Sequence, residues 1–206
     1  TPDVVDNSLH SCMTVRFDEA GSPLRAKALA ISWGDTDALL VTLDLCGLSQ
    51  DHCAVLRREI SAQTGVGFDG IVISCTHSHS TPMAEPLEGP HAFFDLVKRQ
   101  AVAAAVEAFR SRRPARVGHD ILHVVGASFN TRVPLPDGGV KFARDFREGL
   151  ASGRPIDPRL SILRVDDEAG QPIAAWVRFA AHPACVIFDA PVSAEYPGYM
   201  TDRLSR

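Results

Sequence analysis

Short hydrophobic runs bounded by turn-forming residues recur along the chain and predict most of its secondary structure. Runs rich in Val, Ile and Leu between Gly, Pro, Asn and Asp are typical of β-strands. The predicted strands cover residues 25–32, 38–44, 71–75, 117–126, 160–165 and 173–181. The turn at 33–37 (WGDTD) predicts that the first two strands pair as an antiparallel hairpin. A second turn, at 166–170, joins the last two strands.

Helical spacing of apolar residues appears in segments between these strands. Ser49 is the predicted N-cap of a helix over 51–63, and the Ala-rich stretch 91–110 predicts a longer helix. A further helix is predicted over 198–206, whereas 134–159 reads as a long irregular connection rich in Pro, Gly and charge. The alternation predicts an α/β fold, with α+β as the alternative. We expect a mixed β-sheet flanked by helices, with functional groups at its strand ends.

Composition and charge narrow the class of protein. The 206 residues are 45% hydrophobic and 22% charged, which is ordinary for a globular chain of one domain. A net charge of -4 gives no indication of a nucleic-acid partner. No apolar run approaches the roughly 20 residues that cross a bilayer, so no transmembrane segment is expected. The first residues show no pattern of a signal peptide.

Cysteine usage argues against a disulfide framework. The chain has five cysteines, an odd number, and no CxxC pair. They are Cys12, Cys46, Cys53, Cys75 and Cys185. We expect most of them to be buried thiols outside any disulfide, which is easier to reconcile with a reducing compartment.

Candidate chemistry begins with two histidines directly after the predicted strand 71–75. In an extended segment, side chains at i and i+2 face the same side, so His77 and His79 are predicted to point into one cavity. Paired imidazoles at a strand end indicate a metal or proton-transfer site, although two solvated loop histidines are the alternative. Arg132 and His182 are weaker signals singly, because most arginines are surface charges and a strand-end histidine is often structural.

Taken in order, several segments resemble the N-terminal catalytic region of the neutral/alkaline ceramidases and their bacterial relatives. The resemblance covers residues 26–206 and is specific because the motifs occur in the same order. They are VTLDLCGLS at 41–49, ISCTHSHS at 73–80, NTR at 130–132, FAAHP at 179–183 and VSAEYPGY at 192–199.

The resemblance implies a zinc-dependent amidase that cleaves the N-acyl bond of a ceramide-like lipid. It implies that His77 and His182 are Zn²⁺ ligands and that His79 handles protons or the oxyanion. It also implies that Arg132 binds the substrate or the reacting carbonyl oxygen. Substrate-binding or supporting roles fall on Asp44, Asn130, Glu195 and Tyr199. Neutral imidazoles suit Zn²⁺, and zinc activates water at neutral pH, so the implied chemistry is coherent.

The chain departs from the family pattern at two points. Glu195 stands where the family has Asp, so the carboxylate reaches one methylene farther; a solvated loop carboxylate is the alternative reading. Asp44 also has two readings: it is either a carboxylate of the site or a cap of the turn that follows it. The family also supplies a Glu and a Tyr ligand well beyond its second histidine, and no counterparts follow Tyr199 here.

These departures leave open both the extent of the domain and the function. Residues 1–206 are expected to form a single α/β catalytic domain, or the N-terminal portion of one within a longer chain. The remaining ligands would then come from a missing C-terminal portion or a second subunit. The alternatives are a metallohydrolase of the same fold acting on another amide or ester, and a non-catalytic binding domain. The resemblance suggests a secreted or periplasmic protein with a lipid-like N-acyl substrate; the cysteines leave a cytoplasmic location open.

Overall fold

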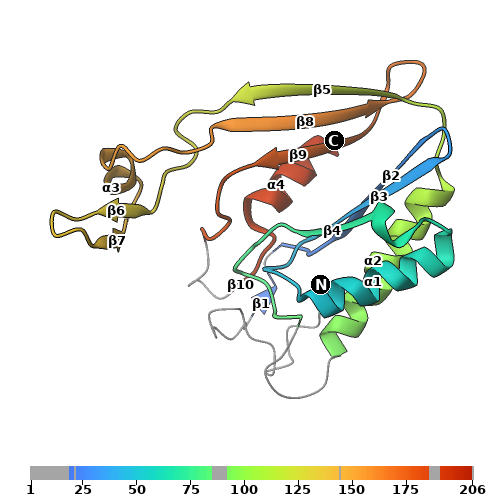
Figure 1. Cartoon of the computed structure of the whole chain (residues 1–206), viewed down its shortest axis with the longest axis horizontal. Helices are drawn as coiled ribbons and strands as arrows, with labels where there is room; N and C mark the ends of the chain where they lie inside the picture. Colours follow the sequence, from blue (N-terminus) through green and yellow to red (C-terminus); the bar gives the residue numbers. More distant parts are fainter. Residues whose placement is uncertain (1–18, 21, 85–91, 144, 186–190, 206) are drawn as a thin grey trace. The chain divides into compact units, whose positions relative to one another are not determined.

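The computed structural model describes residues 19–20, 22–84, 92–143, 145–185 and 191–205. The chain divides into two compact units (Figure 1). The first comprises Thr1–Arg112 together with Pro183–Arg206, and the second comprises Arg113–His182. The predicted extent of a catalytic domain stays a prediction.

A three-stranded mixed sheet is the centre of the first unit. Strands β2 (Ala26–Trp33) and β3 (Thr36–Leu43) form the predicted antiparallel hairpin, with Ala26 opposite Leu43. Strand β4 (Ile71–Cys75) pairs with β3 in parallel, which gives the order β2-β3-β4. The prediction of a hairpin followed by a short strand is confirmed, but β4 is not a buried strand, because it lies at the sheet edge and Val72 is 46% exposed.

Two helices pack against this sheet and enclose the core. Helix α1 (Gln50–Thr64) begins at the predicted N-cap, where the Ser49 side chain accepts a hydrogen bond from the His52 amide. Helix α2 (Ala92–Arg110) follows and contacts α1, β2 and β3. Alternate residues of β3 are buried beneath the helices, as a half-buried strand requires. The buried core residues include Leu39, Val41, Leu43, Leu56, Ile60, Ile71, Phe94, Ala101 and Ala105.

The connection between α1 and β4 is tight because of one glycine. A short 3₁₀ turn, η1 (Phe68–Gly70), leads directly into β4. A Cβ atom on Gly70 would lie 2.7 Å from the backbone oxygen of Asp37, at the start of β3. Glycine therefore permits the close approach that brings β4 alongside β3.

The C-terminal stretch completes the first unit. Strand β10 (Pro191–Val192) pairs in parallel with β1 (Glu19–Ala20), and helix α4 (Glu195–Leu204) follows. The helix begins three residues earlier than the predicted 198–206. A 2.8 Å salt bridge between Arg25 and Asp202 joins the helix to the residue just before β2.

The second unit has a sheet of its own. Strands β5 (Arg116–His123), β8 (Arg159–Asp166) and β9 (Pro172–Phe179) form an antiparallel sheet in the order β5-β8-β9. The predicted strands after residue 112 therefore pair with one another and do not extend the mixed sheet. Strand β5 ends at His123, three residues before the predicted end.

The predicted irregular connection contains regular structure, so that prediction is wrong in part. Strand β7 (Val140–Phe142) pairs with β6 (Arg132–Pro134) around a turn at Gly138, and helix α3 (Phe146–Ala151) follows. Both strands are only three residues long, and such short elements leave little periodicity in a sequence. The α/β class itself is confirmed.

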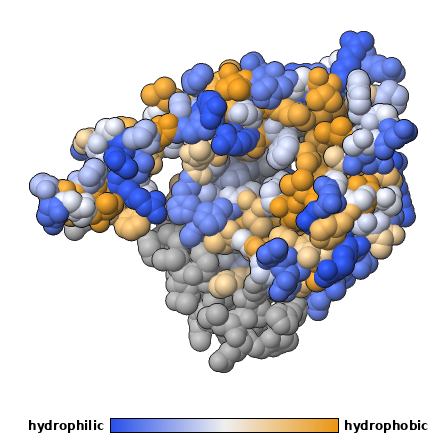
Figure 2. All heavy atoms as spheres, viewed as in Figure 1, coloured by the Kyte–Doolittle hydropathy of each residue, from blue (hydrophilic) through white to orange (hydrophobic). Residues whose placement is uncertain are grey.

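Hydrophobic side chains lie exposed among polar ones on the viewed face of the molecule (Figure 2). In β5 every residue is exposed, and Val117 and Leu122 are each about half accessible. The structure thus leaves part of the second unit's sheet uncovered within the described residues.

Candidate metal centre

The parallel pairing of β3 and β4 brings the loops after both strands together. Leu43 is opposite Cys75 at the ends of the two strands. The pairing continues into the loops, because the Thr76 amide donates to the Leu43 carbonyl and the His77 amide donates to the Leu45 carbonyl, each at 2.9 Å. The loop that holds Cys46 therefore lies beside the loop that holds the histidine pair, although 31 residues separate Cys46 from His77.

His77 has an unusual backbone conformation that turns its ring toward Cys46. Its φ is 67°, in the left-handed region that residues with a Cβ seldom adopt. Its Nδ1 lies 2.7 Å from the Cys46 carbonyl oxygen. A carbonyl only accepts hydrogen bonds, so Nδ1 carries the proton and the neutral ring keeps its lone pair on Nε2.

His79 faces that lone pair. The two Nε2 atoms lie 3.2 Å apart, and the rings meet edge to face with centroids 4.7 Å apart. The His79 amide donates to the Pro183 carbonyl at 3.1 Å, which fixes the backbone beside the pair. The predicted convergence of the two rings is observed, but its predicted reason is wrong. The segment is bent at His77 and is not extended, so the bend brings the rings together.

The donor set fits a metal ion. One ligand atom from each of Cys46, His77 and His79 lies within 4.8 Å of the other two. Two nitrogens that bind one tetrahedral zinc at about 2.0–2.1 Å lie roughly 3.3 Å apart, close to the observed 3.2 Å. A His N–H bound to a backbone carbonyl is the usual support of a metal-binding imidazole. The Thr76 hydroxyl next to His77 is also buried, with no hydrogen-bond partner among the described residues.

A buried carboxylate braces the histidine loop from the C-terminal stretch. Glu195 is 2% exposed, and its Oε1 accepts from Ser80 Oγ at 3.0 Å and, more weakly, from Ser78 Oγ at 3.5 Å. Its Oε2 accepts from the Cys185 amide. Ser78 Oγ also donates to the Ser193 carbonyl at 2.8 Å. The carboxylate therefore ties the loop on both sides of His79 to the segment after Pro183.

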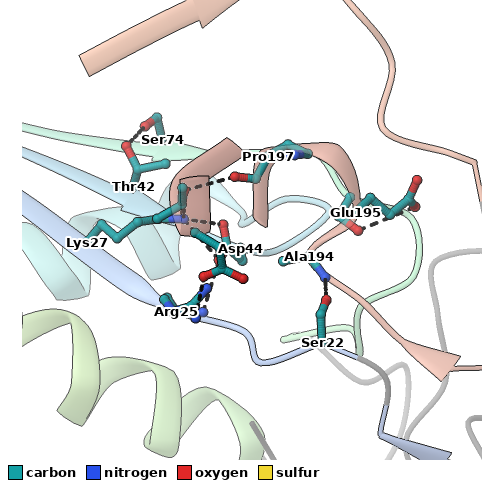
Figure 3. A network of polar contacts seen from close by, with 12 residues as sticks. Ser22, Arg25, Lys27, Thr42, Asp44, Ser74, Ala194, Glu195 and Pro197 are labelled. Carbon is teal, nitrogen blue, oxygen red and sulfur yellow. Dashed lines mark hydrogen bonds and ion pairs between the residues drawn. The ribbon is translucent and has the colours of Figure 1, made fainter. Parts of the chain in front are cut away.

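Glu195 itself adopts a left-handed conformation, with φ of 48°. Its amide donates to Ser193 Oγ at 2.9 Å, and the neighbouring Ala194 amide donates to Ser22 Oγ (Figure 3). These bonds satisfy amides that the start of α4 leaves without helical partners. Two left-handed residues, His77 and Glu195, thus lie at the two ends of one hydrogen-bonded network.

Known proteins resemble this chain in sequence and in fold. No family model matches it. The neutral ceramidase B of Dictyostelium discoideum is 26% identical over 181 residues, which are 79% of this chain and 24% of that protein. The chain is thus similar in sequence to a neutral ceramidase. The resemblance predicted from the ordered motifs is confirmed.

Two solved structures share the fold of this chain. One is a ceramidase complexed with C2, with a TM-score of 0.62 over 89% of this chain. The other is the neutral ceramidase from Pseudomonas aeruginosa, with a TM-score of 0.60 over the same share. Both are 16% identical to the chain, which covers 33% and 34% of their lengths. The chain therefore spans a quarter to a third of the relatives that it matches.

Asp44 is held in an ion pair in the first unit. Its buried carboxylate accepts from Lys27 Nζ at 2.8 and 3.0 Å and from the Arg25 amide at 3.1 Å (Figure 3). Lys27 Nζ also lies 3.4 Å from Thr201 Oγ1 of α4. These partners account for the burial of the charge. Tyr199, on the same helix, is 67% exposed. Their roles toward a substrate stay predictions.

Three other residues with predicted roles belong to the second unit. Asn130 accepts from the Arg132 amide at 3.0 Å and donates to the Pro155 carbonyl at 3.1 Å. Arg132 opens β6, and its guanidinium carbon lies 5.6 Å from the ring centroid of Phe142. His182 is exposed. Their catalytic and metal-binding roles stay predictions.

The cysteines differ from their predicted burial, and one of them was missed as a site residue. Cys46, Cys53 and Cys75 are half-buried and Cys185 is exposed, whereas Cys12 lies outside the described residues. Cys185 is exposed because β9 ends at Phe179 and the chain continues as a loop. Cys46 gave no metal-site signal in sequence because its histidine partners are 31 and more residues away. Only the parallel strand pairing reveals it.

We expect Cys75 to react slowly with alkylating reagents. Burial, with a smaller contribution from Cys53, raises the pKa of the Cys75 thiol from 9.0 to about 12. Because the thiolate is the nucleophile, a rise of three units leaves about 1000-fold less thiolate below pH 9. Mass-spectrometric mapping of iodoacetamide labelling at pH 8 measures this, with the exposed Cys185 as the internal control. Labelling of both cysteines at equal rates would contradict the prediction.

A cavity of about 780 Å³ lies elsewhere, between α1 and α2. It is lined by residues such as Glu59, Lys98 and Val102, and neither His77, His79 nor Cys46 lines it.

In the part of the chain that is described, no helix has both the length and the hydrophobicity that crossing a bilayer needs.

Proposed function

We propose that this chain carries part of the active centre of a zinc-dependent amidohydrolase of the ceramidase type. Its substrate would be a ceramide-like lipid, cleaved at the N-acyl amide bond. The observation that carries the proposal is the pair of imidazoles whose Nε2 atoms converge to 3.2 Å at the end of a sheet strand. The relationship to the neutral ceramidases supports the reaction class.

In this proposal His77 and His182 bind the zinc. The fixed tautomer of His77, with its proton on Nδ1, leaves Nε2 available to a metal without a prior proton transfer. His182 enters through the resemblance, and Pro183, which follows it in the chain, accepts the hydrogen bond of the His79 amide. Bound zinc would supply Lewis acidity and activate water at neutral pH.

His79 is the proposed proton-transfer residue. Its Nε2 lies beside Nε2 of His77, so a proton held there is close to the reacting groups and is available for the leaving amine. The ring is half-buried, and an imidazole can carry a proton on either nitrogen, which suits a proton-transfer role. Its amide bond to Pro183 and the Glu195 brace on Ser78 and Ser80 hold the backbone on both sides.

Arg132 is proposed to stabilise the oxyanion that forms when the amide carbonyl is attacked. A guanidinium donates in a fixed fork and keeps its charge at all relevant pH values, which suits a developing oxyanion. Asn130 accepts from the Arg132 amide and so supports the backbone from which the guanidinium extends. Substrate contacts of Asp44 and Tyr199 remain part of the proposal.

Assays on the protein in its full natural length test this proposal. We expect about one zinc per chain and hydrolysis of ceramide, with slower cleavage of short non-lipid amides and of ester analogues. Preference for an ester or a non-lipid amide would instead indicate another metallohydrolase of the same fold. A zinc-loaded protein that cleaves no member of an N-acyl lipid and amide panel would overturn the proposed activity. A protein that binds no metal and cleaves no member of the panel would favour a non-catalytic binding domain.

A further inference from the structure

Two histidines do not complete a zinc site, which normally has about three protein ligands and an open position. The nearby carboxylates are already engaged. Asp44 is bound by Lys27 and the Arg25 amide, and Glu195 is bound by serine hydroxyls and the Cys185 amide. Removing either carboxylate from its buried partners would leave those partners uncompensated. Among the described residues, Cys46 is the side chain that lies near His77 and His79 and carries a suitable donor.

The backbone of Cys46 is held rigidly against the pair. Its amide donates to Thr81 Oγ1 at 3.0 Å, and its carbonyl accepts from His77 Nδ1 at 2.7 Å. Thr81 in turn donates to the Ser78 carbonyl at 3.0 Å, so Cys46 is fixed to the loop that bears both histidines. Cys46 Sγ lies 3.9 Å from His77 Nδ1, and the thiol is only half-buried.

Cys46 and His77 offer donor atoms to one ion, with the proton-transfer residue His79 beside them. The donor atoms lie within 4.8 Å of one another. In a tetrahedral zinc site with Zn–S of about 2.3 Å and Zn–N of about 2.0–2.1 Å, sulfur and nitrogen are roughly 3.6 Å apart. Because the Cys46 backbone is held, rotation of its side chain is the movement that would bring Sγ to a metal on His77 without moving the histidine loop.

We infer that Cys46 supplies a thiolate ligand to the metal ion held by His77. This inference rests on the metal site of the proposed function and adds a ligand that the resemblance does not provide. On binding, the S–H bond breaks, its proton passes to solvent, and a metal–sulfur bond forms. A thiolate makes the site softer, so Zn²⁺, Co²⁺ and Cd²⁺ are favoured over Mg²⁺ and Mn²⁺.

Cobalt spectroscopy on the full-length protein tests the inference directly. We expect Co²⁺ to give a near-ultraviolet thiolate-to-metal charge-transfer band together with visible d–d bands. In Cys46→Ser the charge-transfer band should disappear, and zinc affinity should fall by more than the roughly 10–100-fold typical of a lost supporting residue. The matched control is Cys53→Ser, which removes a half-buried thiol on α1 and should leave both signals unchanged.

The outcomes separate this inference from the proposed function. Visible d–d bands without a charge-transfer band in the wild-type protein would overturn the thiolate ligand while leaving a histidine metal site intact. Absence of any metal binding would overturn both. A charge-transfer band that is lost in Cys46→Ser supports the ligand even if the protein hydrolyses no lipid.

A second measurement uses the unaltered protein, in case Cys46→Ser does not fold. Iodoacetamide labelling is mapped by mass spectrometry with and without zinc. Zinc should slow the labelling of Cys46 at least about tenfold, because a metal-bound thiolate is shielded, while Cys185 should label at the same rate in both samples. Equal labelling of Cys46 with and without bound zinc would overturn the inference.

Discussion

Replacing His77 by Asn is expected to remove bound zinc and to lower amide hydrolysis by about 1000-fold. The loss follows because Asn offers no imidazole lone pair where Nε2 now converges on His79. A metal contributes several kcal/mol of transition-state stabilisation, and roughly 1.4 kcal/mol corresponds to each tenfold in rate. Asn tolerates the left-handed backbone better than most residues, so the fold should be kept at a φ of 67°. Metal analysis and steady-state kinetics measure the two effects.

The matched control is His119→Asn, because His119 is an exposed histidine of β5. It should retain both zinc and activity. Circular dichroism of both variants checks that the fold is intact. If His77→Asn kept its zinc at the wild-type level, the assignment of His77 as a ligand would be wrong.

Replacing Glu195 by Ala should destabilise the protein by about 3 kcal/mol. The change leaves the Ser80 hydroxyl and the Cys185 amide without their buried acceptor, and hydrogen bonds to a charged group contribute about 1.5–3 kcal/mol each. It also leaves a cavity in a site that is 2% exposed. Urea unfolding followed by circular dichroism gives the free energy of unfolding.

Two conservative variants sharpen this test. Glu195→Gln keeps one accepting oxygen and should lose less stability than the Ala variant. Glu195→Asp introduces the residue of the family pattern, yet its shorter side chain cannot reach both Ser80 and the Cys185 amide. We therefore expect an intermediate loss. Unchanged stability in Glu195→Ala would show that the carboxylate is not a brace of the histidine loop.

The sequence predicted the local elements of the first unit well. The hairpin of β2 and β3 follows from alternating apolar residues around a polar turn, and α1 follows from the Ser49 cap. These features depend on residues close together in the chain, which pattern analysis reads directly. The His77–His79 pair was found for the same reason, since both residues lie in one short motif.

Contacts between distant segments could not be predicted in this way. The bend at His77 depends on hydrogen bonds to Leu45 and Cys46, and the Cys46 thiol is placed by the parallel pairing of β3 and β4. The partners of Glu195 in the histidine loop, Ser78 and Ser80, lie more than 100 residues earlier in the chain. Separation of the later strands into a second sheet was missed because strand patterns do not specify their partners.

The distance in sequence between Glu195 and its partner Ser80 affects how the protein is made. The two residues are 115 positions apart, and the first unit is built from stretches on both sides of the second unit. At synthesis rates of about 5–20 residues per second, the histidine loop leaves the ribosome roughly 6–23 seconds before the carboxylate that braces it. During that interval the nascent loop lacks its buried acceptor, so we expect the metal to be loaded late in biogenesis, after α4 has been translated.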